Sequence, residues 1–191
     1  MKTPRNRPTF GPRTPPSQAP AIPGDNRILF CKRDREQFGF LSNFYPSPIA
    51  IENETWPTTE HFYQGQKSRQ SEYRHAIQTA VSPGQAKRLG TDPALPKSQS
   101  GQSWFRASGT DIRADWQQVK LEVMRIAVRA KFTQNADLAR LLLATASAEL
   151  IEDSENDQFW GLAKNGDGLN WLGRVLMEVR ATLEVTQVPA N

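Results

Sequence analysis

The feature that most constrains the fold is a long helical pattern between residues 115 and 132, which contains no glycine or proline. Two apolar stripes follow it at helical spacing: the first consists of Val119, Val123, Ile126, Ala127 and Ala130, and the second of Leu121, Met124, Val128 and Phe132. A helix that is apolar on two sides is buried on both, so we predict that it is central to the molecule. Asp115 is expected to cap its first turn, with Gln118 as the partner in a capping box.

Shorter patterns predict a few strands and several further helices. Residues 28–31 form a short apolar strand, and residues 49–56 form a hairpin that turns at Glu52-Asn53-Glu54. Further helices are expected from Ser82-Pro83 to Gly90, after Asn135 and after Asn170. The predicted fold class is therefore α+β, with one helix-dominated catalytic domain over residues 27–187 and a few short strands.

Residues 1–26 are basic and rich in proline, and we expect them to form a disordered tail. Such a tail contributes to the net charge of +4 and attracts nucleic acid weakly, without sequence preference. The single cysteine, Cys31, excludes an internal disulfide framework and indicates a reducing, cytoplasmic environment. No apolar run approaches the roughly 20 residues of a membrane helix, so no membrane partner is expected.

The segment from Trp56 to Lys67 predicts a helix with an unusual polar face. Thr58 or Thr59 caps the helix, and four residues share one face at about 3.6 residues per turn. These four residues are Glu60, Tyr63, Gln64 and Lys67. A solvated face with ion pairs would carry the same charges. The aromatic residues of the segment indicate instead that it lies against an apolar wall, which makes this face a candidate site.

A second polar cluster lies between residues 152 and 173. Gly166 and Gly168 at alternate positions and Asn170 precede the last apolar helix, so this loop leads into a helix N-terminus that favours an anion such as phosphate. Glycines also serve ordinary turns, so the loop alone is compatible with either use. Trp160-Gly161 adds an aromatic plane, which suits a nucleotide-like ligand.

Several short motifs follow one another along the chain: Asn43-Phe44-Tyr45-Pro46, Trp56-Pro57-Thr58 with Glu60-His61, Trp116 before Val119-Lys120, Lys131-Phe132, Glu152 with Asn156-Asp157, Trp160-Gly161, and Gly168 with Asn170, Leu172 and Gly173. In this order they resemble the YbiA-like proteins of the NADAR superfamily, from about residue 31 to about residue 183. The resemblance implies an N-glycosidase that acts on ribosides and ribotides of nitrogen heterocycles, including early riboflavin intermediates. Relatives in the superfamily remove ADP-ribose from guanine bases.

The chain departs from the family pattern in two places. Leu162-Ala163-Lys164 follows the Trp-Gly pair where the family has more glycine, which puts the details of a phosphate loop in doubt. The segment from residue 94 to residue 110 is longer and more polar, and it contains Trp104-Phe105-Arg106. It could cover the substrate as a flap, but an inert surface loop is the expected structure.

Cleavage of the bond between ribose C1 and nitrogen builds positive charge on the sugar and negative charge on the leaving base. Glu60 and Asp157 lie among aromatic residues and are the expected catalytic pair, although Asp157 could instead cap a turn. Lys67 could form a Schiff base with C1 if burial or a cationic neighbour lowers its pKa. The resemblance favours a lysine of this kind, for which Lys131 and Lys164 are the alternatives.

The remaining candidates are expected to bind the substrate. Trp116 and Trp160 would stack on either side of the base, and Asn43 and Gln64 would bind sugar hydroxyls. Gly161, Gly168 and Asn170 complete the predicted binding set. His61 is expected to be structural, and the absence of a metal-ligand spacing predicts no metal and no cofactor.

Three functions fit these residues. The first is hydrolysis of the N-ribosyl bond of a small nucleotide-like riboflavin intermediate. The second is the same chemistry on ADP-ribosylated guanine, in a nucleotide or in DNA. The third is a non-catalytic module that binds ADP-ribose, for which an acid and amine pair is unnecessary. Similarity over the core favours the first.

Overall fold

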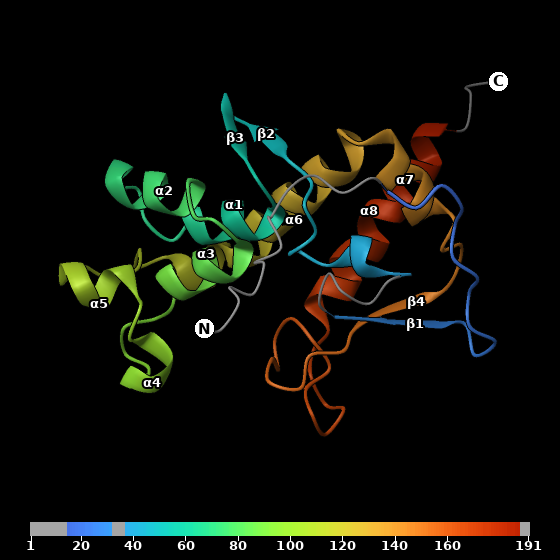
Figure 1. The fold of residues 1–191 in the computed structure, drawn as a ribbon. Coiled ribbons are helices and arrows are strands. Elements are labelled where there is room, and N and C mark those ends of the chain that lie inside the picture. Colours follow the sequence, from blue (N-terminus) through green and yellow to red (C-terminus); the bar gives the residue numbers. More distant parts are fainter. Residues whose placement is uncertain (1–14, 32–36, 188–191) are drawn as a thin grey trace, which may run out of the picture.

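The computed structural model describes residues 15–31 and 37–187. Residues 1–14, most of the predicted basic tail, lie outside the described residues, whereas residues 15–26 run along the domain, where Pro16 O accepts a hydrogen bond from Arg140. Figure 1 shows the elements in chain order: β1 (Arg27–Phe30), η1 (Gly39–Leu41), β2 (Ile49–Ile51), β3 (Glu54–Trp56), α1 (Thr59–Gly65), α2 (Ser71–Gln78), α3 (Pro83–Leu89), α4 (Lys97–Ser100), α5 (Trp104–Ser108), α6 (Trp116–Thr133), α7 (Ala136–Leu143), β4 (Glu149–Glu152) and α8 (Trp171–Gln187).

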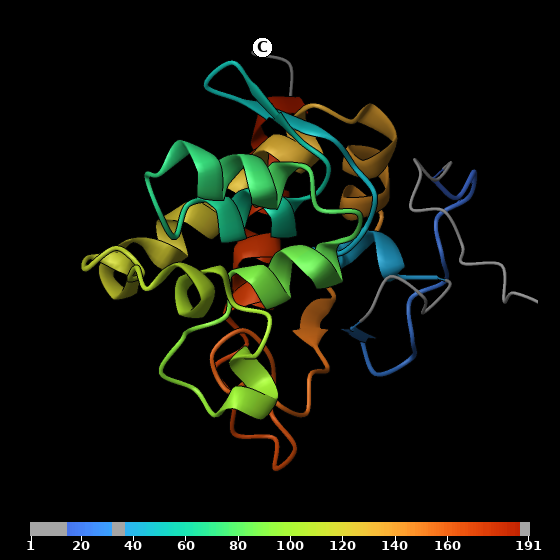
Figure 2. The same cartoon turned by 60° about the vertical axis from the view of Figure 1, so that its left-hand side comes forward.

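Helix α6 is the central helix, as its two apolar stripes predict. It contacts α1, α7, α8 and strand β2 (Figures 1 and 2). Met124, Val128 and Phe132 are almost completely buried, whereas Ile126 is 41% exposed. The predicted capping box is wrong, because the Asp115 carboxylate makes no cap and instead pairs with the Arg113 guanidinium at 2.5 Å. The pair is bidentate, with Arg113 Nε and Nη2 donating to the two carboxylate oxygens at 2.5 and 2.6 Å.

Two small sheets complete the domain. The antiparallel hairpin of β2 and β3 pairs Ile49 with Trp56, and its turn residues Glu52 and Asn53 have φ angles of 50° and 65°. Left-handed residues at both turn positions match the twist of a tight hairpin, so the predicted turn is confirmed. The other sheet pairs β1 with β4 in parallel. The last residue pair between the two strands is Phe30 opposite Glu152. Helix α8 packs against β4, which places the end of that strand beside the interior.

Helix α1 is short and every one of its residues is buried. Thr58 caps it, since its hydroxyl oxygen accepts a hydrogen bond from the backbone N–H of His61 at 3.2 Å. The His61 ring bridges Thr58 Oγ1 and Ala80 O at 2.8 and 3.2 Å, and burial lowers its pKa to about 4. His61 therefore has the structural role that was expected of it.

The segment from residue 94 to residue 110 is not an inert surface loop. It forms α4 and α5, and Phe105 is 1% exposed with its ring centre 4.8 Å from that of Tyr73. The Arg106 guanidinium donates to Pro93 O and Leu95 O at 2.5 and 2.9 Å. The aromatic residues that suggested a flap instead anchor this segment to α2 by burying apolar area, and Arg106 ties α5 to the chain before α4 by satisfying its carbonyl groups.

A buried lysine joins α6 to the loop before β2. Lys131 is 1% exposed, and its Nζ donates a hydrogen bond to Ser42 O at 2.9 Å. Burial lowers the pKa of Lys131 to about 7, below its usual 10.5. Between these two values the unfolded chain binds a proton that the folded chain does not, so Lys131 makes the free energy of unfolding rise with pH.

Replacing Lys131 with methionine is expected to remove this contribution. Between pH 7 and pH 10 the free energy of unfolding of Lys131→Met should rise less steeply with pH than that of the unmodified protein. Urea unfolding at several pH values measures the difference in slope. Lys97→Met, a matched change at an exposed lysine of α4, should leave the slope unchanged. Equal slopes for Lys131→Met and the unmodified protein would contradict the lowered pKa of Lys131 as the source of this pH dependence.

Candidate functional site

The candidate site is a cavity of about 200 Å³ between α1, α3, α6 and the chain that follows β4. We call it the central cavity. Its lining combines three carboxylates, two amines and three aromatic rings with an amide pair, a hydroxyl and a thioether. The residues are Ser42, Asn43, Phe44, Glu60, Tyr63, Gln64, Lys67, Lys87, Met124, Glu152, Asp157 and Trp160. The predicted face of α1 and the predicted acid from the second cluster therefore meet in one place.

Glu60 lies in the first turn of α1 and is 6% exposed. Its Oε1 accepts a hydrogen bond from Gln64 Nε2 at 2.8 Å, one helical turn later. Burial raises the pKa of Glu60, and the positive charge of Lys87 opposes that rise. Gln64 thus holds the Glu60 carboxyl group in place, and burial favours the protonated form of that group.

Lys67 follows the end of α1 and faces the same cavity as Glu60. Its Nζ donates to Gly90 O at 2.6 Å and lies 5.8 and 5.7 Å from the ring centres of Tyr63 and Trp116. Burial lowers the pKa of Lys67 to about 8, against the opposing charge of Glu60. A large fraction of this amine is therefore neutral in mildly alkaline solution, as a nucleophilic lysine requires.

The two alternative lysines lie elsewhere. Lys131 is not part of the lining of the central cavity and donates its hydrogen bond to Ser42 O. Lys164 is exposed in the loop between Asp157 and α8, and it too lies outside the lining. Among the three lysines that the sequence proposed, only Lys67 reaches the cavity that holds the carboxylates.

Asp157 fixes a turn and also lines the central cavity, so its role as a catalytic acid stays a prediction. Its Oδ1 accepts hydrogen bonds from the backbone N–H groups of Phe159 and Trp160 at 3.1 and 2.8 Å, which fixes the turn. Asp157 also lines the central cavity. The turn therefore holds this carboxylate rigidly at the wall of the site.

Tyr63 separates the two tryptophans that were expected to enclose a base. Its ring centre lies 5.0 Å from that of Trp116 and 5.5 Å from that of Trp160. Trp116 is 6% exposed and faces a neighbouring cavity, whereas Trp160 lines the central cavity. The proposed sandwich of a base between the two tryptophans is wrong, because the two rings line different cavities.

Replacing Trp160 with alanine is expected to weaken substrate binding by about 1–3 kcal/mol, the usual contribution of one aromatic ring stacked on a base. Trp160 is half-buried and lines the cavity, so a flat ligand can reach its ring. Calorimetric titration with a non-cleaved substrate analogue measures the change. Trp171→Ala is the matched control, because Trp171 contacts Phe159 and lies outside the cavity lining. Unchanged affinity in a folded Trp160→Ala protein would contradict the prediction.

Asn43 and Gln64 line the cavity, and each amide has at least one protein partner. Asn43 Nδ2 donates to Met124 Sδ at 3.3 Å, and its Oδ1 accepts from Thr59 Oγ1 at 3.0 Å. Gln64 Nε2 donates to Glu60, as described above, whereas its Oε1 has no hydrogen-bond partner among the described residues. Both amides therefore position neighbouring groups of the site, and a role in binding sugar hydroxyls stays a prediction.

Gly161, Gly168 and Asn170 lie outside the lining of the central cavity. A side chain on Gly161 would meet Glu152 O at 2.7 Å, and one on Gly168 would collide with the backbone of Gly161 and Leu162. The three residues thus build the loop after β4, and the close approach of its backbone segments requires the glycines.

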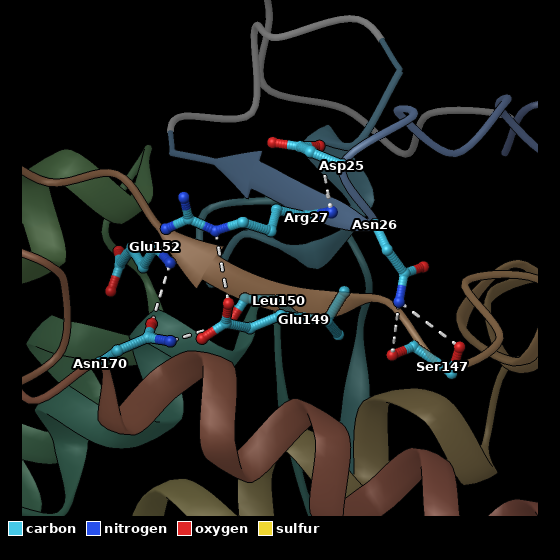
Figure 3. Close-up of polar contacts among 8 residues, drawn as sticks. All are labelled: Asp25, Asn26, Arg27, Ser147, Glu149, Leu150, Glu152 and Asn170. Carbon is cyan, nitrogen blue, oxygen red and sulfur yellow. Dashed lines mark hydrogen bonds and ion pairs between the residues drawn. The ribbon is translucent and has the colours of Figure 1, made fainter.

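Asn170 fastens this loop to the end of β4. Its Oδ1 accepts from Glu152 N at 3.0 Å, and its Nδ2 donates to Leu150 O at 2.9 Å (Figure 3). The N–H groups of Trp171 and Leu172, which begin α8, donate to the carbonyls of Phe159 and Trp160, both at 3.1 Å. The phosphate site that the sequence predicted at this helix N-terminus is wrong, because backbone carbonyls occupy those donors.

Glu152 and Lys87 are site residues that the sequence analysis did not select. Glu152 ends β4, and burial raises its pKa to about 8, with the negative charge of Asp157 contributing. Lys87 lies on α3, and its charge lowers the pKa values of both Glu60 and Glu152. A strand that pairs with a partner about 120 residues away leaves no local signal for Glu152. The pattern of α3 gives none for Lys87.

Two global features complete the description. In residues 15–31 and 37–187, no three side chains of His, Cys, Asp or Glu are grouped so that they could hold a metal ion. Over the same ranges, no helix has the length and apolar character needed to cross a membrane.

Comparison with known proteins identifies the family. A family model described as the NADAR domain matches residues 29–184. N-glycosidase YbiA of Escherichia coli (strain K12) is 43% identical over 150 residues, 78% of this chain and 84% of that protein. A riboflavin biosynthesis protein of Vibrio vulnificus (strain YJ016) is 42% identical over 157 residues, 82% of this chain and 38% of that protein.

The NMR structure of the Escherichia coli protein YbiA matches this fold with a TM-score of 0.70 and 40% sequence identity, over 86% of this chain and 88% of that one. The agreement confirms the predicted α+β, helix-dominated fold with few short strands. The match of one family model to most of the chain establishes its membership, and the chain therefore belongs to the NADAR domain family.

Proposed function

We propose that this protein is an N-glycosidase, a hydrolase that cleaves the bond between a nitrogen heterocycle and ribose or ribose phosphate. The observation that carries the proposal is the meeting of an amine with a lowered pKa, Lys67, and the carboxyl groups of Glu60 and Asp157 around one cavity. The names of two similar proteins, an N-glycosidase and a riboflavin biosynthesis protein, support this activity and an early riboflavin intermediate as substrate.

The proposed chemistry divides the work among these groups. The neutral amine of Lys67 attacks ribose C1, the bond from C1 to the heterocycle nitrogen breaks, and the heterocycle leaves. The sugar ring then opens to give an imine on Lys67, which water hydrolyses to free lysine and the aldehyde sugar. The Asp157 carboxylate stabilises positive charge at C1, and the Glu60 carboxyl transfers protons to and from the attacking groups.

Other functions receive less support. Removal of ADP-ribose from guanine in nucleotides or DNA uses the same bond chemistry, but the names of the similar proteins above do not point to it. A module that only binds ADP-ribose needs no amine of lowered pKa beside buried acids. The single cysteine supports the expected cytoplasmic location, where thiols stay reduced.

An assay with the purified protein tests the proposal directly. It is incubated in parallel with a ribosylaminopyrimidine, its 5′-phosphate and ADP-ribosylated guanosine, and chromatography with mass detection follows free base and free sugar. Release of base from the ribosylaminopyrimidine or its phosphate is the expected result. Release from the guanosine adduct alone would favour the second activity. The absence of release from all three substrates would overturn the proposal.

A further inference from the structure

Glu152 lies on the wall shared by two cavities. One is the central cavity; the other is a larger cavity of about 510 Å³, which we call the outer cavity. Four residues line both: Ser42, Phe44, Lys87 and Glu152. Lys67, Glu60 and Asp157 line the central cavity and not the outer one, so Glu152 is the carboxyl group that lies between these groups and the outer cavity.

The outer cavity has the character of a site for a flat heterocycle. Its lining is more apolar than polar, with the ring of Phe44 and the side chain of Leu95 among its walls. Thr91, Gln99 and Ser154 add a few polar groups. A mostly apolar cleft with a few polar groups is typical of a pocket that binds and orients a small heterocyclic ligand.

The Glu152 carboxyl group is shielded from water and has a free oxygen. Among the described residues, its Oε2 has no hydrogen-bond partner although it is inaccessible to solvent. An unpaired buried oxygen is costly, so such a group indicates a partner that arrives with a ligand. Three charged groups act on it: Asp157 and Glu60 raise its pKa, and Lys87 lowers it.

The backbone of Glu152 is held rigidly on three sides. Its N–H donates to Asn170 Oδ1 at 3.0 Å, its carbonyl accepts from Leu162 N at 2.9 Å, and its strand pairs with Phe30 of β1. In Figure 3 its side chain points away from Asn170. A fixed backbone anchors the start of the side chain at the wall between the two cavities, which keeps the carboxyl group within reach of a ligand there.

We propose that Glu152 is the proton donor to the leaving nitrogen and that the leaving heterocycle lies in the outer cavity. The inference rests on the proposed N-glycosidase function. In this step the bond from C1 to nitrogen breaks and its electron pair goes to the nitrogen, which takes the proton from Glu152. The proton released by the attacking amine or water then restores the Glu152 carboxyl group.

The test compares two substrates that differ in their need for a proton. A ribosylaminopyrimidine must gain a proton on nitrogen as it leaves, whereas an N-ribosyl pyridinium such as nicotinamide riboside leaves as a neutral base. For Glu152→Gln, kcat for the ribosylaminopyrimidine is expected to fall by about 10²- to 10⁴-fold. Its kcat for the pyridinium riboside should stay within about threefold of that of the unmodified protein.

Glu149→Gln is the matched control. Glu149 lies on the same strand, is exposed, and pairs with Arg27 on the outside at 3.3 Å (Figure 3). This variant should keep the activity of the unmodified protein on both substrates. An equal loss on both substrates in Glu152→Gln would assign Glu152 a structural role and overturn the proposal, as would the absence of any loss.

A measurement on the unmodified protein supports the test without any variant. Because burial raises the pKa of Glu152 to about 8, a proton donor there predicts that kcat/KM for the ribosylaminopyrimidine falls above about pH 8. The pyridinium riboside should lack this fall, and a fall that is the same for both substrates would overturn the assignment.

If the unmodified protein cleaves only the ribosylaminopyrimidine, the fall above about pH 8 must disappear in Glu152→Gln. A fall that persists in this variant overturns the proposal. Inactivity on both substrates would instead overturn the proposed function, and the proton donor with it.

Discussion

Replacing Glu60 with glutamine is expected to lower turnover of a ribosylaminopyrimidine by about 10²- to 10⁴-fold and to leave the fold intact. Glutamine keeps the shape of the side chain, and its Oε1 can still accept the hydrogen bond from Gln64 that Glu60 accepts at 2.8 Å. It cannot take up or release a proton. Steady-state kinetics with the purified variant measure the effect, and circular dichroism checks the fold.

The stability of Glu60→Gln adds a second expectation. Burial raises the pKa of Glu60, which means that the folded state disfavours its charged form. A neutral amide removes this penalty, so the variant should be at least as stable as the unmodified protein near pH 7, above the ordinary pKa of a glutamate. Glu72→Gln, at an exposed position of α2, is the control for both measurements. Near-normal turnover in Glu60→Gln would exclude Glu60 from the catalytic machinery.

The part of the site that could be predicted is the part that depends on local geometry. Glu60 and Gln64 are four residues apart on α1, and helical periodicity alone brings such residues to one face. Lys67 lies just beyond the end of the helix, in a turn whose N–H still donates to Gln64 O at 3.1 Å, so the chain continues in the same direction. The structure places all of them on the wall of one cavity. In the same way, the two apolar stripes were enough to predict that α6 is central, since their spacing depends only on the helix itself.

The parts that the sequence analysis missed depend on distant pairings. Strand β4 has only four residues, and its partner β1 precedes it by about 120 residues, so no local pattern shows that Glu152 ends a buried strand. Asn170 illustrates the reverse problem. Its position before α8 suggested a helix cap and a phosphate site, but its amide satisfies the backbone of β4 instead. Local chemistry gave several uses for this amide, and only the tertiary contact decides among them.

The placement of the carboxylates explains how one small cavity can support both halves of the proposed reaction. Asp157 is held by two backbone N–H groups at 3.1 and 2.8 Å, which fix its carboxyl group at the wall of the cavity. Glu60 is buried and Glu152 is half-buried with its Oε2 shielded from solvent, and this desolvation raises the pKa of each, which favours their neutral forms. Neighbouring acids with different environments can act as charge stabiliser and as proton donors at the same pH.

Replacing Lys67 with arginine is expected to abolish both turnover and a covalent adduct. If Lys67 forms an imine with ribose C1, a hydride reductant added during turnover should trap the sugar on the protein. The trapped mass should equal that of the reduced ribosyl portion and map to a peptide that contains Lys67. An arginine at this position stays protonated and cannot attack C1. Mass spectrometry of the intact protein and its peptides measures the adduct, and Lys164→Arg, at an exposed lysine, should keep both adduct and turnover.

The pH dependence of the reaction tests the same amine independently. Burial lowers the pKa of Lys67 to about 8, so the attacking neutral form is lost as the pH falls below that value, and kcat/KM should fall with it. An active Lys67→Arg variant would rule out this lysine as the nucleophile. Trapping at Lys131 or Lys164 would keep the covalent route and move the nucleophile. Turnover without any adduct would indicate direct attack by water, which Glu60 or Asp157 can orient because both line the central cavity.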